Sequence, residues 1–84
     1  MGDEMVGSFL DEYKNLGHNI AYYRKQAHLT QEGLALKANL SRGYLSQIEA
    51  ENVEKAPSLE MVFNIAAVLK IPVYKLFMRP HETD

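Results

Sequence analysis

The side chains that could bind a metal are scattered along this chain. His18, His28 and His81 are its three histidines, and no two of them have the i, i+4 spacing that would place a pair of ligands on one helix. The absence of cysteine excludes both a thiolate zinc site and a disulfide framework. We therefore expect no metal site and no cofactor.

Catalytic chemistry has equally little support in the sequence. Ser41 and Ser46 carry hydroxyl groups, but nothing nearby indicates a base to activate them or a residue to orient that base. The acidic residues that might serve instead are better interpreted as solvated: Asp11, Glu12, Glu51 and Glu54. We expect that the protein is not an enzyme.

Charge is distributed unevenly along the chain, whose formal net charge is −2. Residues 1–12 contain four acids and no base, and residues 49–84 contain six acids and four bases. Between them, residues 13–48 contain five bases and a single acid. The middle of the chain is therefore basic, and the overall acidity does not exclude a nucleic-acid partner.

The composition is that of one small globular domain, with 46% hydrophobic content in 84 residues. We divide the chain into a flexible acidic lead at residues 1–8, a domain at 9–78 and a polar tail at 79–84. No apolar run approaches the ~18 residues of a membrane span, and the acidic start does not resemble a signal peptide. We expect a cytoplasmic protein without a membrane partner.

Hydrophobic periodicity predicts five helices and no strand. The first covers residues 9–28, with Gly17 as a possible break because glycine is a poor helix former. The others begin at residues suited to a helix start: Thr30, Ser41, Ser58 and Pro72.

The fourth helix has the strongest apolar stripe, and we expect it to be the most buried. Its stripe consists of Leu59, Val62, Phe63, Ile65, Ala66 and Leu69. In the fifth helix, Val73, Leu76 and Phe77 are expected to face inward.

Residues 30–49 read as two short helices joined by the turn Asn39-Leu40-Ser41. Asparagine tolerates a left-handed backbone, and serine can accept a hydrogen bond from the first N–H groups of the next helix. Two helices joined so tightly must cross steeply, which predicts a helix-turn-helix within a compact all-α domain.

These elements resemble the helix-turn-helix family of the Cro and lambdoid phage repressors, also called the XRE family. The resemblance covers residues 16–77 and is carried by four segments in order: RKQAHLTQEGLA, SRGYLSQIE, PSLE and IPVYKLF. It implies a five-helix lambda-repressor-like DNA-binding domain whose third helix enters the major groove.

The resemblance also assigns roles on the third helix. Ser41, Arg42, Gly43 and Gln47 occupy the family's base-facing positions. Arg42 is the strongest candidate for direct reading, because a guanidinium can bond guanine O6 and N7 together, and Gln47 can pair with adenine in the same way.

Phosphate contacts and one structural pair follow from the same resemblance. Gln31 occupies the position that fixes the motif to a phosphate, and further phosphate candidates are Lys37, Tyr44, Ser46, Asn52 and Lys55. Arg24 and Glu49 match a largely buried ion pair that ties the first helix to the third.

The resulting hypothesis is a sequence-specific double-stranded DNA-binding transcriptional regulator of the repressor type, with no small-molecule ligand. It would read a palindromic operator as a homodimer with half-sites ~34 Å apart. An apolar patch for the dimer is expected from Val53, Tyr74, Met78 and either Met61 or Val68.

The loop at residues 51–57 departs from the family, because it is about two residues longer and carries two acids. Together with the acidic tail, this loop motivates an alternative function as an antitoxin-like or adaptor protein-interaction module in which DNA binding is secondary. Salt-dependent affinity for duplex DNA distinguishes the two.

Overall fold

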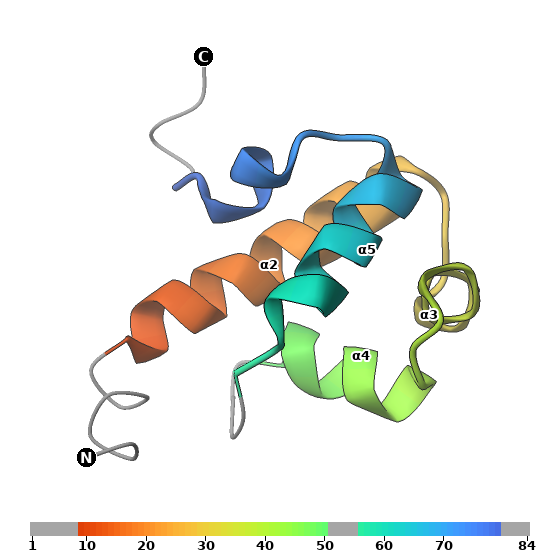
Figure 1. Ribbon diagram of the computed structural model, residues 1–84, viewed down its shortest axis with the longest axis horizontal. Helices are drawn as coiled ribbons and strands as arrows, with labels where there is room; N and C mark the ends of the chain where they lie inside the picture. The colour runs from red at the N-terminus through yellow and green to blue at the C-terminus, as the bar shows by residue number, and fades with distance from the viewer. Residues whose placement is uncertain (1–8, 51–55, 80–84) are drawn as a thin grey trace.

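The computed structural model describes residues 9–50 and 56–79, and in this part of the chain it contains four α-helices, one short 3-10 helix and no strand (Figure 1). The all-α class is thus correct. The expected lead at 1–8, the acidic loop at 51–55 and the tail beyond Arg79 lie outside the described residues.

Helix α2 (Leu10–Gln26) is the longest element. Acidic residues occupy its first turn and Arg24 and Lys25 its last, an arrangement that complements the helix dipole. The helix ends at Ala27, after which His28 takes a left-handed conformation with φ of 60°. The break considered at Gly17 is absent, because α2 runs through it without interruption.

Gly17 is needed for a close approach between helices. It is buried, and a Cβ added there would overlap the main-chain oxygen of Ile48 and lie 3.3 Å from Cα of Glu49. The glycine therefore lets the end of α4 (Arg42–Glu49) rest against the α2 backbone. This contact offsets the low helix propensity of glycine.

Caps define both helices of the central motif, as the sequence predicts. The Thr30 Oγ1 accepts from the Gly33 N–H at 2.9 Å to start α3 (Gln31–Ala38). The Ser41 Oγ accepts from the Tyr44 N–H at 3.0 Å to start α4. Between them, Asn39 is left-handed with φ of 62°.

Helix α5 (Leu59–Leu69) starts where Ser58 Oγ accepts from the Met61 N–H at 3.2 Å. The final element, η1 (Val73–Phe77), is a 3-10 helix, so the prediction of five α-helices is wrong. Extended backbone at Pro72 and Met78 limits η1 to five residues, too few to establish an α-helical ladder.

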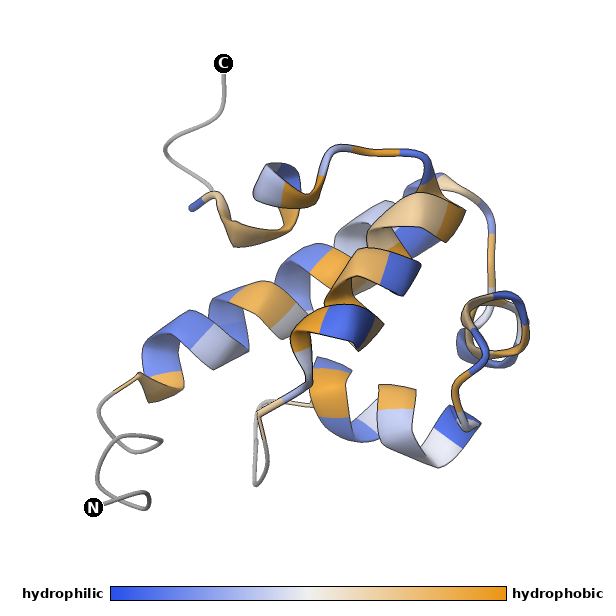
Figure 2. Cartoon of the chain, in the orientation of Figure 1, coloured by the Kyte–Doolittle hydropathy of each residue, from blue (hydrophilic) through white to orange (hydrophobic). Residues whose placement is uncertain are grey.

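Each element contributes one core residue that has no exposed surface. These residues are Ile20, Leu34, Leu45, Ile65 and Leu76, all with 0% exposure. Apolar and polar residues alternate around each helix accordingly (Figure 2). Helix α5 packs on α2, α3 and η1, whereas α4 packs on α2 and α3.

Three of the predicted core positions are exposed instead. Leu59 and Phe63 on α5 are 65% and 52% exposed, and Phe77 on η1 is 48% exposed. Val62, Ile65, Ala66 and Leu69 face the core, and Leu59 and Phe63 turn away from it. The apolar face of α5 is thus wider than the part that its neighbours cover.

Two asparagines fasten η1 to α2. Asn19 Nδ2 donates to the carbonyl oxygens of Leu76 and Met78 at 2.8 and 2.7 Å, and Asn15 Nδ2 donates to the same Met78 oxygen at 3.2 Å. These bonds satisfy carbonyls that a short 3-10 helix leaves without internal partners. Among the described residues, no helix is long and apolar enough to cross a membrane.

Candidate nucleic-acid interface

One face of α4 and its N-cap are exposed. Its exposed residues are Ser41, Arg42, Gly43, Ser46 and Gln47. The opposite face carries Leu45 and Ile48, which are buried, so burial of this face fixes the rotation of the helix. All four residues predicted to read bases are therefore exposed, Ser41 as the N-cap and the other three within α4.

Gly43 is not required by the fold. A Cβ added there would have no neighbour within 4 Å, and its φ is not positive. In this it differs from Gly17, which the packing of α2 on α4 demands. The bare backbone at Gly43 leaves the start of α4 open to close approach by another molecule.

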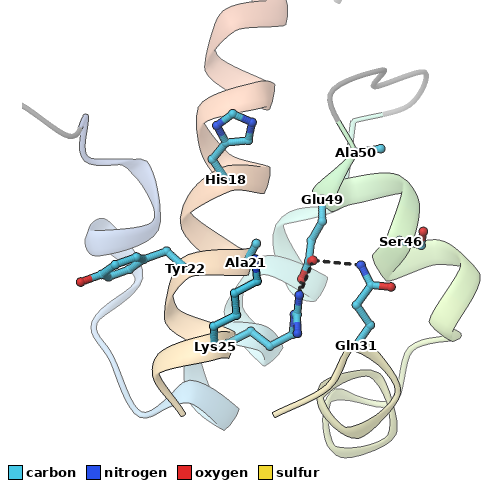
Figure 3. Close-up of a pocket in the computed structure, with 9 residues that line it drawn as sticks. His18, Ala21, Tyr22, Lys25, Gln31, Ser46, Glu49 and Ala50 are labelled. Carbon is cyan, nitrogen blue, oxygen red and sulfur yellow. Dashed lines mark hydrogen bonds and ion pairs between the residues drawn. The ribbon is translucent and has the colours of Figure 1, made fainter. Parts of the chain in front are cut away.

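The pair expected between Arg24 and Glu49 is present and joins α2 to α4. Arg24 Nε donates to Glu49 Oε2 at 2.8 Å, and Nη2 donates to Oε1 at 3.0 Å (Figure 3). Arg24 Nη1 also donates to the Leu29 carbonyl at 2.9 Å. The two side chains are only 11% and 5% exposed, so the fork is shielded from solvent.

Gln31 is held by the same carboxylate. Its Nε2 donates to Glu49 Oε1 at 3.0 Å (Figure 3). An amide nitrogen has two N–H groups, so the bond to Glu49 leaves one for a further acceptor. The ion pair thus orients the residue predicted to hold a phosphate.

Helices α2 and α4 touch at Gly17, and residues of both helices together with Gln31 line a groove of about 640 Å³. Helix α2 lines it with His18, Ala21, Tyr22 and Lys25, although the Tyr22 ring points away from α4 (Figure 3). Helix α4 contributes the other wall with Ser46, and Arg24 and Glu49 also line the groove. The α2 residues were absent from the sequence-based candidates, although their spacing of four and three places them on one face.

The remaining phosphate candidates lie in different places. Lys37 is exposed at the end of α3, beside a separate hollow between α3 and α5. Tyr44 is half-buried against the core, and its oxygen accepts from the Ser58 N–H at 3.4 Å. Asn52 and Lys55 lie outside the described residues.

Comparison with known proteins agrees with this architecture. Residues 20–76 match a family described as helix-turn-helix. The chain belongs to this family. The segment that matches contains α3, α4 and the turn between them, together with α5 and most of η1.

Two relatives are regulators by name. The chain is 36% identical over 69 residues to the HTH-type transcriptional regulator SinR of Bacillus subtilis, covering 82% of this chain and 61% of SinR. It is 45% identical over 58 residues to the immunity repressor protein of Bacillus phage phi105, covering 69% of this chain and 39% of that protein. The chain thus spans about three fifths or less of these relatives.

A solved structure extends the comparison to three dimensions. The crystal structure of the biofilm regulator SinR in complex with DNA superposes with a TM-score of 0.69 at 35% sequence identity. It covers 75% of this chain and 98% of the SinR chain.

Proposed function

We propose that this chain binds double-stranded DNA in a sequence-specific manner and regulates transcription as a repressor. The observation that carries the proposal is the outward face of α4, on which Arg42, Gly43 and Gln47 are all exposed in the part of the chain that the structure describes. The relationship to SinR, which has been seen on DNA, and to a phage repressor supports it.

The geometry of α4 suits a major groove. A helix is ~10–12 Å across, similar to the ~12 Å width of that groove. The start of α4, where Gly43 exposes the backbone, can approach base edges closely. Arg42 and Gln47 then supply bidentate donors and acceptors for guanine and adenine.

Affinity measured against salt tests DNA binding itself. Neutralising phosphates releases counterions, so log K should fall steeply with log salt, by ~0.9 for each phosphate contacted. A flat dependence, or no duplex binding at low salt, would contradict the proposal and favour the protein-interaction alternative.

Two substitutions distinguish a residue that recognises bases from a residue that contacts a phosphate. Arg42→Ala should weaken binding to the preferred site by about 1–3 kcal/mol while leaving random duplex nearly unchanged. Gln31→Ala should weaken both duplexes to a similar degree, because a phosphate carries no sequence information. Equal losses for Arg42→Ala on both duplexes would remove this residue from the reading role.

We also propose that the chain reads a palindrome as a homodimer in the cytoplasm. Tyr74 is 56% exposed on η1, and Met61, Val68 and Met78 are half-buried, so part of the expected patch is accessible. Val53 lies outside the described residues. Sedimentation that shows only monomer over a concentration series, with and without palindromic duplex, would refute dimerisation.

A further inference from the structure

The groove between α2 and α4 adds a contact that the motif alone does not contain. We propose that this groove receives one sugar-phosphate backbone of the bound duplex, and that Lys25 of α2 contacts a phosphate there. The inference rests on the proposed function and adds α2 to the elements that hold DNA.

The position of the groove follows from that of α4. A helix nearly fills the width of the major groove, so the two backbones must pass close to its two sides. Ser46 lies on one side of α4, and its side chain lines the groove there. The facing wall is α2, with Lys25 on it (Figure 3).

The charge in the groove favours an anion. Glu49 is the acid that lines it, but this carboxylate is 5% exposed and accepts three hydrogen bonds from Arg24 and Gln31. Lys25 is exposed and makes no ion pair among the described residues. Among the described residues that line the groove, its ammonium therefore supplies the accessible charge.

Hydrogen-bond donors complement this charge. Gln31 Nε2 retains one N–H beyond its bond to Glu49, and the Ser46 hydroxyl is exposed on the opposite wall. Phosphate oxygens accept such bonds. A cation on α2 and neutral donors on α3 and α4 thus face the same space.

Salt titration of duplex binding tests the role of Lys25. Removing one phosphate contact should lower the slope of log K against log salt by about 0.9. Because the proposed homodimer loses one such contact from each protomer, the slope should fall by about 1.8, and the ratio of wild-type to Lys25→Ala affinity should shrink by about 12-fold between 50 and 200 mM salt, equally on specific and random duplex. Lys25→Arg should keep the wild-type slope.

Lys75→Ala is the control for loss of charge, at a half-buried lysine. It removes the same charge from η1, which lies on the opposite side of α2 from α4 (Figure 1). Its slope should equal that of the wild type. Equal slopes for Lys25→Ala and Lys75→Ala would overturn the inference, provided that thermal melts show both variants folded.

Neutral methylphosphonate linkages, placed one at a time in the duplex, locate the contact. At one flanking position the neutral linkage should weaken the wild type but not Lys25→Ala. If no position distinguishes the two proteins, the Lys25 contact is refuted while DNA binding stands. Wild-type protein that binds no duplex would refute the proposed function itself.

Discussion

The Arg24–Glu49 pair should be essential to the fold, and Glu49→Gln tests it with almost no change in shape. The substitution removes the negative charge and puts an NH₂ group against the Arg24 donors. Because the Arg24 side chain is only 11% exposed, its charge would remain largely buried without a counter-charge. Breaking one side of such a pair costs about 3–5 kcal/mol.

That loss is large relative to the whole domain. At roughly 0.05–0.15 kcal/mol per residue, a chain of this size is stabilised by about 4–13 kcal/mol. For a domain of this length each 1 kcal/mol shifts the melting temperature by about 4–8 °C, so Glu49→Gln should melt at least ~12 °C lower.

Chemical denaturation of four proteins provides the assay: wild type, Glu49→Gln, Arg24→Leu and the double variant Arg24→Leu/Glu49→Gln. The double variant should lose less stability than Arg24→Leu and Glu49→Gln together, because neither charge is left unpaired. A loss below about 1 kcal/mol for each single variant, or simple additivity, would refute the reasoning.

An exposed ion pair offers the control for that experiment. Arg79 Nη2 lies 3.2 Å from Glu12 Oε2, with the two side chains 36% and 55% exposed. Solvent screens this pair, so Glu12→Gln should change the free energy of unfolding by no more than about 1 kcal/mol.

Three further substitutions test the fold and the face of α4. Gly17→Ala should destabilise by about 1–3 kcal/mol in thermal melts, because the new methyl meets the Ile48 carbonyl. Gly43→Ala should leave the melting temperature unchanged or raised but weaken duplex affinity; unchanged affinity would argue against close approach of DNA there. Ser41→Ala should cost about 1 kcal/mol through loss of the bond to the Tyr44 N–H, and an unaltered melting curve would show that the cap is dispensable.

The helix starts were predictable because they depend on local chemistry. Thr30, Ser41 and Ser58 each accept from the N–H three residues ahead, and Asn39 takes the left-handed turn that its short polar side chain permits. Such features need only a few neighbouring residues, so the sequence contains the necessary information.

Two features depend on residues that are distant in the sequence: which apolar residues of α5 are exposed, and that η1 is a 3-10 helix and not an α-helix. Leu59 and Phe63 belong to a wide apolar face, and only the placement of α2, α3 and η1 decides which part is covered. The close approach at Gly17 likewise requires α4 to lie against it. A periodic pattern identifies the apolar face of a helix, but it does not show how much of that face the neighbouring helices cover.

The candidate site divides in the same way. The α4 residues form a continuous sequence motif, and rotation of one short helix is enough to bring Arg42, Gly43 and Gln47 together. The groove could not be predicted in this way, because Lys25, Gln31 and Ser46 come from three different helices. Only the packing of these helices brings the three residues together.

Selection of bound sequences from a random duplex pool tests the central claim most directly, which is that the exposed face of α4 reads bases. The wild type should enrich a two-fold symmetric site with guanine at one position in each half, and Arg42→Ala should lose the preference at that position alone. A pool that shows no enriched site, or the same site with both proteins, would contradict it.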